Sequence, residues 1–103
     1  MSNTDGLSES SEKNVRFQCV APGAQRVFLA GTFNAWDAAA APMQADQFGD
    51  WHVAMELSPG RYEYKYIVDA EWCCEPGIAD GHYVGEGTVL NAFGTKNRVI
   101  EVE

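Results

Sequence analysis

Residues 50–69 read DWHVAMELSPGRYEYKYIVD and contain two strand-like runs joined by a turn. In each run, apolar or aromatic side chains alternate with mostly polar ones, which is the pattern of a β-strand that packs one face against a core. The faces predicted to be buried carry Trp51, Val53, Met55 and Leu57 in the first run and Tyr62, Tyr64, Tyr66 and Val68 in the second. The linking residues Ser58, Pro59 and Gly60 are typical of a turn, so these residues predict a β-hairpin.

Similar short runs lie on both sides of this pair. The predicted strands are 13–20, 25–31, 50–57, 60–69, 87–91 and 97–102, with a short additional piece at 71–73. The four alanines at 38–41 are too few for a stable helix and are followed by Pro42, so this stretch is predicted to be a loop. Several short strands without a helix longer than one turn indicate an all-β fold, arranged as a β-sandwich.

The chain has 103 residues, enough for one small domain. We expect this domain to span 13–103, because residues 1–12 are almost entirely polar and predict a disordered tail. The net charge of −8 argues against binding of nucleic acid or an anionic membrane by charge alone. It favours a neutral ligand or a basic partner protein. No apolar run reaches roughly 18 residues and no signal peptide is recognisable, so a cytoplasmic location is expected.

The cysteines and histidines do not form a recognisable motif. Three cysteines are an odd number, and the adjacent Cys73 and Cys74 would point to opposite faces of a strand. We therefore expect reduced, semi-buried thiols rather than a disulfide or a redox pair. No CxxC or HxxxH spacing occurs, so neither a metal nor a cofactor is expected. Motifs for nucleophilic catalysis are also absent, although a pair of glycosidase-type carboxylates is not excluded by composition.

Two tryptophans end strand-like runs. Trp36 closes VFLAGTFNAW and Trp72 closes YEYKYIVDAEW. Each could be a core residue, as is predicted for Trp51, or it could be displayed on a loop. A displayed indole can lie against the apolar C–H face of a sugar ring, which points to carbohydrate binding. Lys65 and Asn97 would ordinarily be a solvated lysine and a turn residue, but both can form hydrogen bonds to sugar hydroxyls.

Three segments follow one another in the order of a known family. They are GTFNAWD, then YEYKYIVDAEW with Glu75 and Pro76 soon after it, and finally NAFGTKNRVIEV. Over residues 15–103 the chain resembles the family 48 carbohydrate-binding module. This family includes the glycogen-binding domain of AMP-activated protein kinase β subunits and the N-terminal domains of isoamylase and glycogen branching enzymes. The resemblance implies an early-set, immunoglobulin-like β-sandwich.

The resemblance also implies a ligand-binding site. In glycogen-binding members the glucan site contains two tryptophans, a lysine and an asparagine, which correspond to Trp36, Trp72, Lys65 and Asn97. A loop with an apolar residue followed by Gly-Thr corresponds to Phe93, Gly94 and Thr95. The chain departs from the family in having Phe93 in place of the usual leucine, Glu-Pro in place of Asp-Pro, and a longer stretch at 77–91 than the kinase subunits.

These observations predict a non-catalytic module that binds α-1,4-linked glucans such as glycogen, starch and maltooligosaccharides. The predicted ligand-binding residues are Trp36, Lys65, Trp72, Phe93, Thr95 and Asn97. The main alternative is a protein-interaction module that docks a kinase or a glucan-metabolising enzyme, because many enzyme-attached relatives have lost the sugar site. Retention of all four anchor residues argues against that loss here. A third interpretation is a piece of an enzyme whose catalytic domain follows residue 103.

Overall fold

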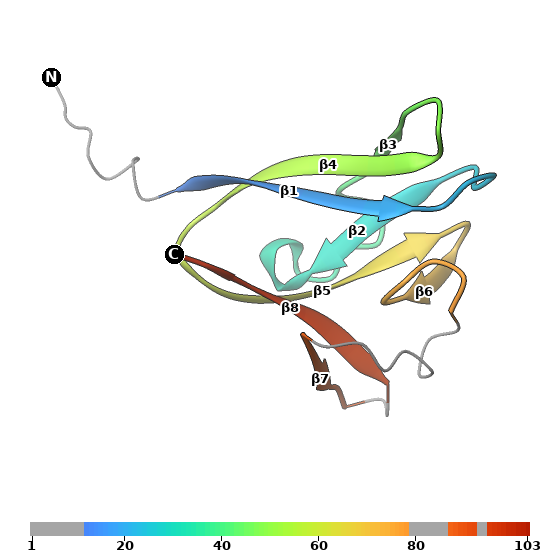
Figure 1. The fold of residues 1–103 in the computed structure, drawn as a ribbon. Coiled ribbons are helices and arrows are strands. Elements are labelled where there is room, and N and C mark those ends of the chain that lie inside the picture. The colour runs from blue at the N-terminus through green and yellow to red at the C-terminus, as the bar shows by residue number, and fades with distance from the viewer. Residues whose placement is uncertain (1–11, 79–86, 93–94) are drawn as a thin grey trace, which may run out of the picture.

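The protein is a sandwich of two antiparallel β-sheets (Figure 1). The computed structural model describes residues 12–78, 87–92 and 95–103. Within them, the first sheet has the order β1-β4-β3 and contains β1 (Lys13–Val20), β4 (Asp50–Leu57) and β3 (Gln44–Ala45). The second sheet contains β2 (Val27–Gly31), β5 (Gly60–Val68), β8 (Lys96–Val102), β7 (Thr88–Leu90) and β6 (Glu71–Cys73). Its order is β2-β5-β8-β7, with β6 paired to β5. The all-β sandwich expected from the sequence is confirmed.

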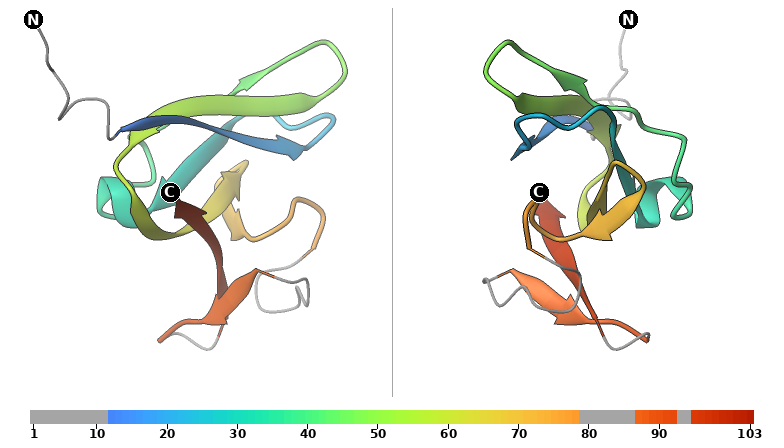
Figure 2. Two further views of the ribbon diagram at one scale, coloured as in Figure 1. Left: turned by 60° about the vertical axis from the view of Figure 1, so that its left-hand side comes forward. Right: turned by 90° about the vertical axis from the view of Figure 1, so that its right-hand side faces the viewer.

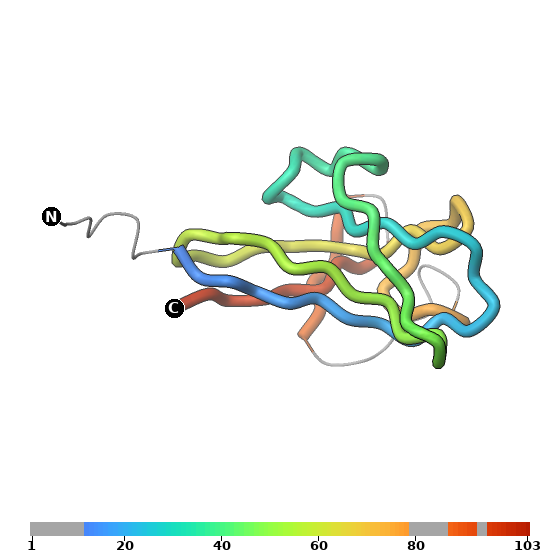
Figure 3. The backbone as a smooth tube through the Cα atoms, turned by 90° about the horizontal axis from the view of Figure 1, so that it is seen from above, coloured from blue at the N-terminus to red at the C-terminus, as the bar shows by residue number. Residues whose placement is uncertain are grey.

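The two sheets form separate layers with the core between them. Figure 2 shows the layers from the side, and from above β1 and β4 run along the length of β5 and β8 (Figure 3). Both faces predicted to be buried contribute to this core: Trp51, Leu57, Tyr64 and Tyr66 belong to it, and the remaining residues of the two faces pack against it. The Trp51 indole N–H donates to the carbonyl of Ala21 at 3.1 Å, so this tryptophan is a core residue as predicted.

The predicted strands agree closely with the observed ones. Residues 13–20, 50–57 and 71–73 are strands with the predicted bounds, while the other predicted strands differ by one or two residues at their ends. The two-residue strand β3 was not predicted. Its side chains are exposed and give no alternating pattern, and it exists because Gln44 and Ala45 pair with β4. Residues 38–41 form turns and a loop, as expected.

The predicted hairpin between residues 50–57 and 60–69 is wrong. Strand β4 pairs with β1 and β3, whereas β5 pairs with β2, β6 and β8, so the chain crosses from one sheet to the other at Ser58 and Pro59 (Figure 1). The Tyr62 hydroxyl donates to the Ser58 carbonyl at 2.7 Å beside this crossover. Alternation shows which face of a strand is buried, but it does not show which strand lies next to it. Two strands that face each other across a core satisfy the pattern as well as two neighbours do.

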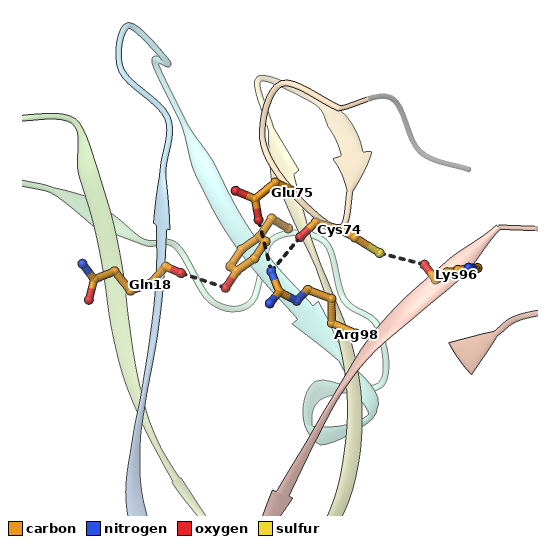
Figure 4. A network of polar contacts seen from close by, with 6 residues as sticks. Gln18, Cys74, Glu75, Lys96 and Arg98 are labelled. Carbon is orange, nitrogen blue, oxygen red and sulfur yellow. Dashed lines mark hydrogen bonds and ion pairs between the residues drawn. The ribbon is translucent and has the colours of Figure 1, made fainter. Parts of the chain in front are cut away.

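The cysteines are three separate thiols that are more deeply buried than expected. Cys74 donates from Sγ to the Lys96 carbonyl at 3.0 Å (Figure 4). The Arg98 guanidinium donates to the Cys74 carbonyl and to Glu75 Oε1, both at 3.3 Å, and so ties the segment after β6 to β8. The pKa of Cys19 is raised to about 12, chiefly by burial and to a lesser extent by the neighbouring Cys73 and Glu75. The Cys19 thiol is therefore protonated near neutral pH.

Two further expectations concern the N-terminal tail and the absence of a membrane-spanning segment. The tail expected at 1–12 lies outside the described residues except for Glu12, which is exposed. In the part of the chain that the structure describes, we find no helix with the length and apolar character needed to cross a membrane.

Candidate functional site

The candidate site lies on the face of the five-stranded sheet that points away from the core. Because Tyr62, Tyr64 and Tyr66 point inward, the residues between them on β5 point outward. A hollow of about 600 Å³ is present on this outer face, within the size range of small-molecule sites. Five of the six predicted residues line it, namely Trp36, Lys65, Trp72, Thr95 and Asn97. The sixth, Phe93, lies outside the described residues.

Trp36 is positioned by a tight turn that follows β2. The chain forms one 3₁₀ turn at Thr32–Asn34, and Ala35 and Trp36 then adopt left-handed conformations with φ of 56° and 61°. Such values are costly for residues other than glycine and are found where the surrounding structure enforces them. Here the Asn34 side chain accepts from the Gly31 N–H at 3.0 Å and donates to the Leu29 carbonyl at 3.2 Å. The Trp36 N–H donates to the Gly31 carbonyl at 2.9 Å.

Trp72 reaches the same hollow from β6. Its backbone pairs with Ile67 of β5, and 37% of the residue is exposed. The rings of Trp36 and Trp72 lie with their centroids 6.4 Å apart and their planes inclined by 42°. The two indoles are therefore neighbours on one side of the molecule, and Trp36 is half-buried. Together they form a bent aromatic surface at the hollow.

Lys65 is not the solvated lysine that its position in an amphipathic strand would ordinarily indicate. It points away from the core, as the alternation predicted, yet only 5% of it is exposed. Its ammonium group donates to Thr95 Oγ1 at 2.9 Å. A buried ammonium group requires hydrogen-bond acceptors to offset the loss of water. Lys65 is therefore a fixed donor in the hollow, because the hydrogen bond limits the motion of its side chain.

Asn91 connects the polar residues of the hollow. Its side-chain N–H groups donate to Thr95 Oγ1 at 2.8 Å and to Asn97 Oδ1 at 2.9 Å, and its Oδ1 accepts from the Thr95 N–H at 3.1 Å. Asn97 in turn donates to Glu63 Oε1 at 2.9 Å. A continuous chain of hydrogen bonds thus joins Lys65, Thr95, Asn91, Asn97 and Glu63. We call these five residues the polar chain.

Two members of the polar chain were not among the predicted site residues. The sequence could have indicated Glu63 as a site residue, because it lies two residues from Lys65 and therefore on the same face of the strand. No sequence pattern indicated Asn91, because its contacts arise only when β7 and β8 pair and bring it beside Thr95 and Asn97. Asn97 itself lies within β8 and is 7% exposed, so it is not a turn residue.

Residues 14–103 match a protein family described as the glycogen recognition site of AMP-activated protein kinase. The chain belongs to this family. The family resemblance expected from the three sequence segments is thereby confirmed, and it covers all five residues of the polar chain and both tryptophans.

Relatives of this chain include two kinds of protein. It is 44% identical over 79 residues to a 1,4-alpha-glucan branching enzyme, GlgB 2, of Rhizobium johnstonii, a match that covers 74% of this chain and 10% of that enzyme. It is 30% identical over 81 residues to the 5'-AMP-activated protein kinase subunit beta-1 of Rattus norvegicus, covering 79% of this chain and 26% of that subunit. The chain therefore spans about a tenth and about a quarter of the lengths of these relatives.

Aromatic rings and hydrogen-bonding groups make up most of the described lining of the hollow. Glu63 is the only acidic residue among the described residues that line it. Across residues 12–78, 87–92 and 95–103, no three histidine, cysteine, aspartate or glutamate side chains are grouped so as to hold a metal ion. His82 lies outside these ranges. The described part of the hollow is thus suited to binding a neutral polar molecule that has apolar faces.

Proposed function

We propose that this domain binds α-1,4-linked glucans such as glycogen, starch or maltooligosaccharides, and that it does so without catalysing a reaction on them. The observation that carries the proposal is the outer-face hollow itself. It combines two adjacent indoles with Lys65, Thr95 and Asn97 held in place by the polar chain. The family membership supports the same ligand class.

The two indoles would provide most of the contact area. Trp36 and Trp72 stack on the C–H faces of successive glucose rings, because a flat aromatic ring offers a large contact area and loses little rotamer entropy. An α-1,4-linked glucan is a curved chain, so its successive rings are inclined to one another. The 42° inclination between the indoles fits such a curve better than a flat, extended polysaccharide.

The polar chain would determine orientation. Sugar hydroxyls both donate and accept hydrogen bonds, so they can pair with the Lys65 ammonium group, the Thr95 hydroxyl and the Asn97 amide. These side chains are already fixed by their mutual hydrogen bonds, and little entropy is lost when the ligand arrives. The site is shallow and solvated, so we expect dissociation constants between about 1 mM and 1 μM, or about −4 to −8 kcal/mol.

The described residues that line the hollow do not provide the pair of carboxyl groups that glycoside hydrolysis ordinarily requires. Most glycosidases place two carboxyl groups on either side of the scissile bond. Here Glu63 is the only carboxylate among the described lining residues, and both of its oxygens accept hydrogen bonds, from Asn97 and from Arg61. A structural role for Glu63 in holding Asn97 therefore explains its position.

The test is isothermal titration calorimetry with maltoheptaose and β-cyclodextrin. The wild type binds both, and Trp36→Ala and Trp72→Ala each abolish most of the binding. Phe48→Ala is the matched control, because Phe48 is an aromatic residue that is 73% exposed in the turn between β3 and β4 of the other sheet. Absence of heat and of any tryptophan fluorescence change with millimolar maltoheptaose would refute the ligand assignment.

We also propose that the domain acts as part of, or together with, a glucan-metabolising enzyme or a kinase. The relatives support this, because the matching segment is a small part of a longer branching enzyme or kinase subunit. A Trp36→Ala, Trp72→Ala double variant separates the two roles. A protein partner that it retains in the presence of competing maltooligosaccharide is held by docking, whereas a partner lost from the double variant was held through glucan.

A further inference from the structure

A second hollow lies on the other side of Trp72. It has a volume of about 670 Å³, and the residues that line it include Trp72, Ile67, Phe28, Ala38, Arg26 and Gln25. We call it the second groove. Trp72 lines both hollows, so its indole is a wall that the two hollows share.

The pairing of the strands places both hollows on the same face of the sheet. Phe28 of β2 is opposite Ile67 of β5, and Ile67 is opposite Trp72 of β6. Residues opposite each other in antiparallel strands point to the same side, so the three side chains form one row across the outer face. Lys65, two residues from Ile67 on the same strand, lies on that face as well. The second groove therefore continues the first hollow along the sheet.

The floor of the second groove is apolar. Ile67 is 4% exposed although it points away from the core, and Phe28 beside it is half-buried. The outer face of a sandwich sheet is ordinarily polar, because water covers it. Ile67 packs between Phe28 and Trp72 in this row. The accessible parts of Phe28 and Trp72 are suited to contact with the C–H face of a sugar ring, as the two indoles of the first hollow are.

Polar groups lie at the far end of the groove. The Asp69 carboxylate accepts from the N–H groups of Gln25 and Arg26 at 2.9 Å each, and the Asp69 N–H donates to the Arg26 carbonyl at 2.9 Å. These three bonds fix the backbone before β2 against the turn before β6. The exposed side chains of Gln25 and Arg26 are thus attached to a rigid edge, and both carry donors for hydroxyl groups.

We propose that the second groove binds further glucose units of the same α-glucan chain that occupies the first hollow. This inference rests on the proposed function and extends it. A polymer bound against Trp72 leaves the first hollow along the outer face, and the second groove is directly continuous with that hollow through the shared indole. Phe28 and Trp72 contact the sugar ring above the buried Ile67, and Arg26 and Gln25 donate to its hydroxyls. The domain therefore prefers long chains to short ones.

The experiment measures affinity as a function of chain length. Linear maltooligosaccharides from maltotriose to maltodecaose are titrated into the wild type, Arg26→Ala and Ala38→Ile. Arg26→Ala removes hydrogen-bond donors from the groove, and Ala38→Ile fills part of its volume. We expect all three proteins to bind short chains equally. With long chains the wild type binds about three- to tenfold more tightly than either variant, which corresponds to the loss of about one net hydrogen bond.

Matched controls exist for both changes. Arg16→Ala removes an exposed arginine from β1 of the other sheet, and Ala39→Ile places the same bulk on the neighbouring exposed alanine, which does not line the groove. Both control variants have the wild-type affinity for maltooligosaccharides of every chain length. Equal affinity for short chains also shows that each variant is folded.

The outcomes distinguish the two proposals. If Arg26→Ala and Ala38→Ile follow the wild-type curve at all lengths, the second groove does not hold glucan. The proposed function then stands, because it does not depend on the second groove. If the wild type binds no maltooligosaccharide of any length, the proposed function fails and the extension fails with it.

Discussion

Substitution of Asn91 by alanine tests whether the polar chain positions the ligand-binding groups. The change removes three side-chain hydrogen bonds, two donated to Thr95 and Asn97 and one accepted from the Thr95 N–H. At about 0.5–1.5 kcal/mol for each net bond, the upper limit is about 4.5 kcal/mol. Asn91 is half-buried, and water replaces part of these contacts. We expect a loss of about 1–2 kcal/mol of unfolding free energy, which lowers Tm by about 5–10 °C.

The effect on binding follows from the same contacts. Without Asn91, Thr95 keeps its bond from Lys65 and Asn97 keeps its bond to Glu63, but both side chains are held less tightly, and ordering them becomes part of the cost of binding. We expect the affinity for maltoheptaose to fall about 5- to 30-fold, which corresponds to about 1–2 kcal/mol.

A second variant separates positioning from simple loss of stability. Asn91→Asp keeps an oxygen to accept the Thr95 N–H, but it places a carboxylate oxygen near Asn97 Oδ1, where the structure has an N–H donor at 2.9 Å. Asn97 must then turn its amide, which breaks its bond to Glu63. Asn91→Asp keeps one bond that Asn91→Ala loses but also breaks the Asn97–Glu63 bond, so we expect a similar loss of stability in both variants. A larger loss of affinity in Asn91→Asp would then reflect the changed orientation of Asn97.

The assays are urea unfolding and calorimetric titration with maltoheptaose. Asn14→Ala is the control, because Asn14 is exposed on β1 and makes one long hydrogen bond of 3.4 Å to Glu56. Asn14→Ala should leave both the unfolding free energy and the affinity for maltoheptaose unchanged. Wild-type affinity within twofold in both Asn91 variants would refute the positioning argument.

Three further predictions concern the turn, a thiol and the charge of the ligand. Gly31→Ala lowers the unfolding free energy by about 1–3 kcal/mol in a urea titration. The reason is that a Cβ atom at this position would lie 2.5 Å from the Glu63 carbonyl oxygen and 2.8 Å from the Phe33 ring. Gly23→Ala is not a matched control, because the φ of 83° at Gly23 adds strain of its own. The unfolding free energy is unaffected by Cys19 below pH 9.0 and falls as the pH rises from 9.0 towards about 12, because the unfolded thiol ionises while the folded one, with its raised pKa, does not. Cys19→Ala makes this fall shallower, and an unchanged slope would show that the thiol titrates normally in the folded protein. Binding of maltoheptaose changes less than twofold between low and high NaCl, since a neutral ligand releases no counterions; a steep dependence in calorimetry would indicate an ionic ligand instead.

The sequence predicted which face of each strand is buried better than it predicted which strands lie next to each other. The alternation in 50–57 and 60–69 identified the core side chains, including Trp51 and Tyr64, because burial of one face imposes a period of two on the residue types. The same alternation did not reveal that β4 and β5 belong to different sheets. Strand pairing depends on contacts between distant segments, and a repeat within one strand contains no information about them.

The residue types needed for a sugar site are present in the sequence, and their order along the chain was sufficient to indicate the family. Trp36, Lys65, Trp72, Thr95 and Asn97 were predicted from that resemblance, and they line one hollow. Their separation in sequence says nothing about distance, and the 6.4 Å between the two rings results from the turn after β2 lying beside β6.

Tertiary structure alone decided how the groups of the site are held. Lys65 is buried and Asn97 is fixed because the pairing of β7 with β8 brings Asn91 and Thr95 over the outer face of β5. The second groove likewise depends on the register that aligns Phe28, Ile67 and Trp72 in one row. Local sequence patterns determine which side of a strand meets water, because that depends on each side chain. Which side chains then meet one another depends on register and crossover, which are properties of the whole packed chain.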